Sequence, residues 1–116
     1  MAGVTKLTTC LTGLKVAKHP RASLLHYYDR ILAVTSKMPK EAAYRVHTEA
    51  IVNTRQAIVN QEKDVSVIES KIGGGQIEEL ISQATKELSL SKKMLSWQPW
   101  EPLVEKAPKD QWKWPL

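Results

Sequence analysis

Histidine and cysteine are the side chains here that could most readily bind a metal or act as a base or nucleophile. The histidines are His19, His26 and His47, and the single cysteine is Cys10. No histidine lies three or four residues from another histidine or from the cysteine, so the sequence contains no local metal-binding pair. One cysteine also excludes an internal disulfide and a multi-cysteine zinc site. We therefore predict no metal site.

Three glycines and two adjacent glutamates are the remaining candidates for chemistry. Glycines occupy positions 73–75, but a phosphate-binding loop would be followed by Lys and Ser or Thr, and here Gln76 and Ile77 follow. Glu78 and Glu79 are neighbours and would point about 100° apart on a helix, so they cannot flank one bond. No serine or cysteine has an identifiable base beside it. We predict that the protein is not an enzyme and holds no cofactor.

The positive charge is concentrated at the start of the chain. Residues 1–28 contain four basic side chains and no acidic one, whereas the rest holds 13 basic and 12 acidic side chains. An acid-free segment with Ser and Thr is typical of a mitochondrial targeting stretch, and a solvated basic arm is the alternative. Because the body is nearly neutral, it lacks the basic stripe expected of a nucleic-acid-binding face. No apolar run approaches the length of a membrane span.

Hydrophobic spacing predicts an all-α fold. Apolar residues recur at steps of three and four over residues 20–37, from Pro39 to about residue 60, and over residues 76–96, with a short helix near 65–72. Short loops between such helices favour a small up-and-down three-helix bundle with one extra short helix. The predicted division is an extended basic segment (1–19), a helical bundle (20–96) and an extended arm rich in Trp and Pro (97–116).

The second helix is predicted to begin at Pro39 and to place Glu41 in its first turn, paired with Arg45. Its predicted inward face follows a spacing of three and four: Tyr44, His47, Ile51, Thr54 and Ile58. A second stripe of small residues would allow another helix to approach closely: Ala43, Ala50 and Ala57.

All four tryptophans lie in the last 20 residues, in an arm that also contains four prolines. Extended at roughly 3.3 Å per residue, this arm could reach about 65 Å, whereas a 20-residue helix measures about 30 Å. A three-helix core is too small to enclose it, and exposed indoles favour aggregation. We therefore predict that the arm docks along a partner protein. An arm that wraps only its own bundle is the alternative. The predicted docking residues are Trp97, Pro99, Trp100, Pro102, Leu103, Trp112 and Trp114.

Several long segments resemble a known family. They are "PRASLLHYYDRIL", "AAYRVHTEAIVNTR", "DVSVIESKIGGGQIEELISQATKELSL" and "KMLSWQPWEPL" followed by "QWKWP". Together they are similar to subunit 5 of the alpha subcomplex of mitochondrial NADH:ubiquinone oxidoreductase, respiratory complex I. Tyr27-Tyr28 stands where the family usually has a leucine-tyrosine pair.

The resemblance implies a helical, non-catalytic accessory subunit without flavin or iron–sulfur cluster. It implies a place in the hydrophilic arm, peripheral to the mitochondrial inner membrane on its matrix side. The implied neighbour in this hetero-oligomer is the core subunit called iron–sulfur protein 3. The alternative is a small three-helix assembly factor or adaptor with a Leu-Tyr-Arg motif, which residues 27–30 echo faintly.

Overall fold

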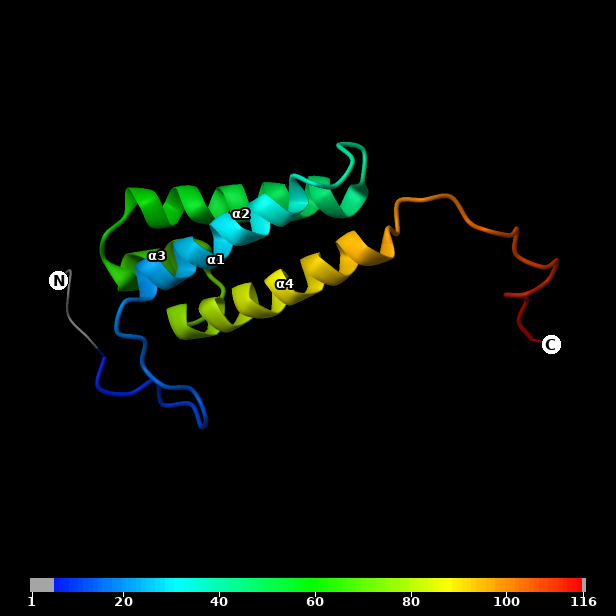
Figure 1. The fold of residues 1–116 in the computed structure, drawn as a ribbon. Helices are drawn as coiled ribbons and strands as arrows, with labels where there is room; N and C mark the ends of the chain where they lie inside the picture. Colours follow the sequence, from blue (N-terminus) through cyan, green and yellow to red (C-terminus); the bar gives the residue numbers. More distant parts are fainter. Residues whose placement is uncertain (1–5, 116) are drawn as a thin grey trace.

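The described part of the chain, residues 6–115 of a computed structural model, contains four helices and no strand. The helices are α1 (Pro20–Thr35), α2 (Ala43–Gln61), α3 (Val65–Ile72) and α4 (Ile77–Trp97) (Figure 1). The predicted all-α class, with three longer helices and one short one, is confirmed. Residues 1–5 of the predicted N-terminal segment, and the last residue of the arm, lie outside the described part.

The turn between α1 and α2 is longer than the sequence predicted. The backbone N–H of Ala42 donates to the Pro39 carbonyl at 3.1 Å, which closes a turn, so α2 begins at Ala43. Glu41 therefore lies before the helix, and its predicted pairing with Arg45 is wrong. Arg45 instead forms an ion pair with Glu49, one turn further into the helix, at 3.0 Å.

Local capping fixes the ends of α3 and the start of α4. Asp64 caps α3 by accepting a hydrogen bond from the Ser66 backbone N–H at 3.0 Å. Gly73 ends the helix with φ +69°, a left-handed conformation that suits glycine. Gln76 precedes α4, and its backbone N–H donates to the Glu79 carboxylate at 2.8 Å. These signals were readable in the sequence because each lies within four residues.

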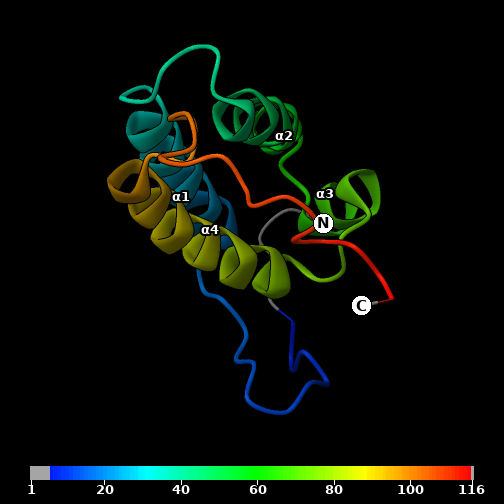
Figure 2. The ribbon, with the colours of Figure 1, turned by 90° about the vertical axis from the view of Figure 1, so that its right-hand side faces the viewer.

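Helix α1 packs against both α4 and α2 (Figures 1 and 2). Helix α1 runs parallel to α4 and antiparallel to α2. At each end of α1, a polar side chain contacts α2. Arg21 donates to the Val59 carbonyl at 2.8 Å, and Thr35 donates to Glu49 at 3.2 Å. The two longer neighbours are thus held on different sides of α1.

The core is a single apolar cluster around α1. Its buried members are Leu24, Tyr28, Ile31, Val52, Val59, Ile68, Ile77, Leu80, Ala84 and Leu88.

The predicted inward face of α2 is wrong by one residue, or about 100° of rotation. The buried residues are Thr48, Val52 and Val59. The predicted positions are half-buried (Tyr44, Ile58) or exposed (His47, Ile51, Thr54), and the predicted alanine stripe at 43, 50 and 57 is also exposed.

The N-terminal segment is attached to the junction of α3 and α4 by polar contacts of Lys6 and Thr9. Lys6 forms ion pairs with Glu78 at 2.8 Å and Glu69 at 3.1 Å. Gln76 donates its side-chain N–H to the Thr9 carbonyl at 2.6 Å. The segment is therefore docked, although its described residues form no helix or strand.

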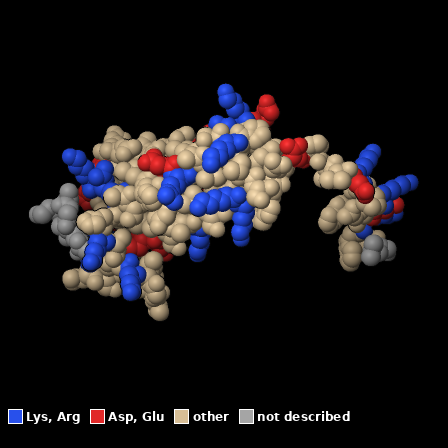
Figure 3. Space-filling model, viewed as in Figure 1, with Lys and Arg blue, Asp and Glu red and all other residues tan. Residues whose placement is uncertain are grey.

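The arm leaves the bundle at the end of α4. Gln98 adopts φ +55° immediately before Pro99, and proline disfavours helical geometry at the preceding residue. The chain then projects away from the bundle (Figures 1 and 3). The radius of gyration is 18.5 Å, against about 13 Å for a compact chain of this length. The projecting arm contributes to this larger value.

Two matched substitutions test the face of α2 that is buried. Val59→Ala should lower the free energy of unfolding by about 2 kcal/mol, because two methyl groups leave the core. Ile51→Ala should change it by less than about 0.5 kcal/mol, because Ile51 is 55% exposed. Urea unfolding followed by circular dichroism measures both. Equal costs would contradict the observed orientation of α2.

Lys6→Met tests the attachment of the N-terminal segment, with Lys15→Met, an exposed lysine, as control. Removing Lys6 leaves the buried Glu78 carboxylate without its cation and should cost about 1–3 kcal/mol in the free energy of unfolding. Lys15→Met should cost nothing measurable by the same denaturant titration. Similar values for both variants would contradict the attachment.

The same pair predicts a pH dependence. Burial alone would lower the pKa of Lys6, but its hydrogen bonds to Glu78 and Glu69 and the charges of these carboxylates outweigh burial and raise it above 10.5. Because the folded value exceeds the unfolded one, the stabilisation is fully present below pH 10.5 and lost as the pH rises through the raised pKa. The difference between the native chain and Lys6→Met should therefore be constant near neutral pH and shrink at alkaline pH.

Candidate partner-docking surfaces

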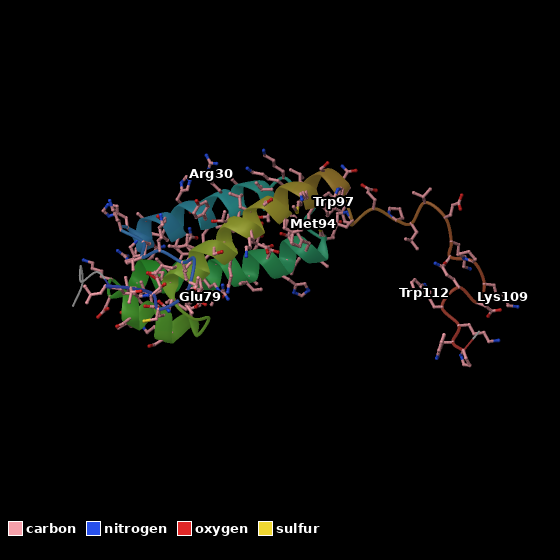
Figure 4. The ribbon with its side chains drawn as sticks, turned by 90° about the horizontal axis from the view of Figure 1, so that it is seen from below. Arg30, Glu79, Met94, Trp97, Lys109 and Trp112 are labelled. Atoms are coloured by element: carbon pink, nitrogen blue, oxygen red, sulfur yellow. The ribbon has the colours of Figure 1, made fainter. Side chains whose placement is uncertain are left out.

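The arm exposes most of its large apolar side chains. Trp97 is 65% exposed, Trp112 85% and Trp114 84%. Leu103 is also exposed, as are Pro99 and Pro102, whereas Trp100 is half-buried. Trp97 lies at the end of α4 and Trp112 lies far out on the arm (Figure 4). The sequence-predicted docking residues are thus available to a partner, and they are spread along the arm, not gathered in one place.

The hydrogen bonds of the arm are local. The backbone N–H of Glu101 donates to the Gln98 carbonyl at 3.1 Å, and the backbone N–H of Lys113 donates to the Asp110 carbonyl at 3.2 Å. Within residues 6–115, no hydrogen bond or ion pair joins positions 99–115 to the bundle. Within the described chain, hydrogen bonds and ion pairs therefore do not fix the direction of the arm relative to the helices.

A groove between α2 and α4 is a second surface, which sequence reasoning missed. It contains a hollow of about 310 Å³ whose floor comes from α1. Two polar contacts cross it: Tyr44 donates to Glu87, and Arg55 donates to Gln83 at 3.4 Å. Burial, and then the Glu87 carboxylate, raise the pKa of Tyr44. The hollow is lined by Tyr28, Ile31, Thr48, Ile51, Val52, Arg55, Gln83, Ala84 and Glu87.

A second hollow of about 310 Å³ lies beside the first and is separated from it by the exposed side chain of Ile51 on α2. It is formed by α2 and the end of α3, and it shares Ile51 and Arg55 with the first hollow. Its remaining residues are Ala50, Thr54, Ile58, Lys71 and Ile72. The exposed face of α2 around Ile51 and Arg55 thus has a hollow on each side.

The residues considered for metal or base chemistry are dispersed. His19, His26 and Cys10 are exposed, and so is His47, whose predicted inward position is wrong. Across residues 6–115, no group of three His, Cys, Asp or Glu side chains lies close enough to hold a metal ion. None of the described helices is long and apolar enough to cross a membrane.

The glycine turn before α4 is occupied by the chain's own carboxylates. Glu79 accepts from the Gln76 backbone N–H, and Glu69 accepts from the Ile77 backbone N–H at 3.1 Å. A helix N-terminus attracts anions through such amides. Because two carboxylates already fill this position, the glycines serve a capped turn and not a phosphate site.

Fluorescence tests the exposure of the arm. Emission from the isolated chain should be that of water-exposed indoles and should be strongly quenched by acrylamide, with Trp100 as the most protected. Blue-shifted emission resistant to quencher from the isolated chain would contradict the exposure of the arm.

Truncation tests whether the arm contributes to the stability of the bundle. A chain that ends after Trp97 should unfold with a free energy within about 1 kcal/mol of the full chain, because the arm adds no core contact.

Known proteins resemble this chain along its whole length. A family described as "ETC complex I subunit conserved region" matches residues 13–79. The Bos taurus protein named NADH dehydrogenase (ubiquinone) 1 alpha subcomplex subunit 5 is 52% identical over 116 residues, 100% of both chains. A probable counterpart from Caenorhabditis elegans is 50% identical over 96% of this chain and 74% of its own. One from Arabidopsis thaliana, named as mitochondrial, is 38% identical over 82% of this chain and 56% of its own.

The match to the bovine protein extends through the helices and the tryptophan-bearing arm alike, because it leaves no residue of either chain uncovered. The chain therefore belongs to the family of alpha subcomplex subunit 5 of NADH dehydrogenase (ubiquinone).

Proposed function

We propose that this chain is a non-catalytic accessory subunit of mitochondrial respiratory complex I, and that it stabilises the hydrophilic arm through which electrons pass from NADH toward ubiquinone. The single observation that carries the proposal is the 52% identity, without uncovered residues, to a bovine protein named as a subunit of this enzyme. The dispersed histidines and the exposed single cysteine supply no alternative centre for chemistry among the described residues.

The C-terminal arm is the proposed means of attachment. Its tryptophans are exposed, and each would bury on the order of 150–250 Å² against a partner. Tyr and Trp supply much of the binding energy at protein interfaces. Because the arm has no hydrogen bond to the bundle beyond its first residues, it is free to follow the surface of another subunit.

The proposed location is peripheral to the inner membrane, on its matrix side, and the proposed neighbour is the core subunit iron–sulfur protein 3. The Arabidopsis thaliana relative is named as mitochondrial, and the acid-free first 28 residues of this chain suit import into mitochondria. The family resemblance of the helices and the arm supports this neighbour. No observation favours the alternative of a free adaptor.

Replacing the outer tryptophans tests the docking arm. Trp112→Ser with Trp114→Ser should lower the amount of the chain in assembled complex I at least about tenfold, because two large apolar contacts are lost. Native gels stained for NADH dehydrogenase activity, with the chain detected by antibody, measure incorporation. Helicity should not change.

Lys109→Ser with Lys113→Ser is the matched control, because these exposed lysines lie in the same part of the arm. It should incorporate normally. If the tryptophan variant also incorporates normally, the arm does not dock. If the native chain itself never migrates with complex I, the assignment as a subunit is wrong.

A further inference from the structure

Two hydrogen-bond donors meet over the apolar floor of the α2–α4 groove. The Tyr28 side chain is only 3% exposed, and its hydroxyl has no hydrogen-bond partner among the described residues. The Arg55 guanidinium lies beside the Tyr28 hydroxyl and donates to Gln83 at 3.4 Å. Burial raises the pKa of Tyr28, and Arg55 opposes this without cancelling it. A buried hydroxyl without an acceptor is unusual in a folded protein.

The groove holds no carboxylate that serves these donors. Glu87 lines the same hollow, but it accepts a hydrogen bond from Tyr44. Within residues 6–115, Arg55 forms no ion pair. Arg55 therefore brings a positive charge to its end of the groove that no carboxylate of the described chain pairs, whereas Lys71 in the adjoining hollow is paired with Glu62.

The surroundings of the two donors are apolar and partly open. Helix α2 repeats the sequence AIVN at positions 50–53 and 57–60, so it carries two parallel apolar stripes. The valines of the repeat are buried, whereas Ile51 is 55% exposed between the two hollows. A second apolar stripe at a seven-residue spacing is typical of a helix that packs against partners on two sides.

We propose that the α2–α4 groove binds a short amphipathic helix of a neighbouring subunit. This helix places apolar side chains in the two hollows and a carboxylate against the Tyr28 hydroxyl and Arg55. The site rests on the proposed function only in that the chain has neighbouring subunits. It does not depend on the arm.

The shape of the bundle favours a helix as the occupant. Helices α2 and α4 both pack on α1, and within residues 6–115 the hydrogen bonds of Tyr44 and Arg55 are those that join α2 and α4 across the groove. A partner helix laid over the groove would complete a four-helix arrangement with the three longer helices α1, α2 and α4. The lined stretch of α2, from Thr48 to Ile58, measures about 15 Å, or about three helical turns.

The chemistry of the groove favours a carboxylate carried on an apolar segment. Arginine pairs with carboxylates through several N–H donors, and a tyrosine hydroxyl donates to the same oxygens. A free anion would satisfy the donors but leave Ile51 and Ile58 uncovered. A purely apolar segment would cover these but leave the Tyr28 hydroxyl without an acceptor and Arg55 without a carboxylate.

Photo-cross-linking in the assembled complex tests the site. p-Benzoylphenylalanine replaces Ile51 in the full-length chain, and the same group replacing Val46 is the matched control. Val46 is 50% exposed on the same helix and lines neither hollow. The probe at position 51 should cross-link to another subunit at least about tenfold more than the probe at position 46. The captured peptide should contain Asp or Glu within two helical turns of the linkage.

Several outcomes would overturn the proposal. They are a cross-link to this chain's own residues 98–116, a cross-link to a second copy of the chain, and no excess at position 51 over position 46. Absence of the chain from purified complex I would instead overturn the proposed function. A probe in place of Trp112 reports on the arm separately.

Charge reversal then tests the carboxylate. Arg55→Glu should reduce the cross-link at position 51 at least about tenfold, and changing the captured Asp or Glu to Lys should restore it. Arg30→Glu is the matched charge-reversal control, because Arg30 is exposed on α1 and lines neither hollow, and it should leave the cross-link unchanged. If Arg55→Glu impairs folding, Ile51→Glu replaces it, because Ile51 is exposed, and should abolish capture of the partner helix by a probe at position 54. Failure of the rescue would show that Arg55 acts only within this chain.

Discussion

The narrow apolar stripe of α1 is the constraint on which the rest of the structure depends. Its buried residues follow a four-three-four spacing, Leu24, Tyr28, Ile31 and Thr35, and both α2 and α4 must pack on them. A stripe of this width holds its neighbours on different sides and does not bring them into full contact with each other. The groove between α2 and α4 is therefore a consequence of how α1 is shared, and the unpaired Tyr28 hydroxyl lies on the floor that both neighbours use.

Much of the fold could be predicted from the sequence, because its signals are local. Pro20, Asp64 and Gly73 mark helix ends through their own backbone chemistry, and each lies where the structure ends or begins a helix. The orientation of α2 could not be predicted in this way. Its AIVN repeats offer Ile and Val at adjacent positions, and only packing against α1 and α3 decides that the valines are buried. The start of α2 could not be predicted either, because Pro39 suits a turn as well as a helix N-terminus.

The two candidate surfaces also differ in whether they could be predicted from the sequence. The exposure of the arm followed from its length and composition, since four tryptophans beyond the last helix exceed what a small core can cover. The groove has no local signature. Tyr28 and Arg55 are 27 positions apart, and nothing in either helix shows that their side chains converge or that neither has a carboxylate partner in the described chain. Whether a buried polar group has a hydrogen-bond partner depends on how the helices pack, so it can be seen only in the folded structure.

A subunit that leaves both surfaces uncovered gains stability from assembly by mass action, since any partner that binds only the folded chain shifts its folding equilibrium. The two surfaces would contribute differently. An extended arm without hydrogen bonds to its bundle can reach over a wide area, but it does little to fix orientation. A groove with two converging donors accepts a partner in one register, because charged hydrogen bonds are directional. Together they would allow a small bundle to reach distant contacts and still adopt a single position in a large complex, which neither surface alone would achieve.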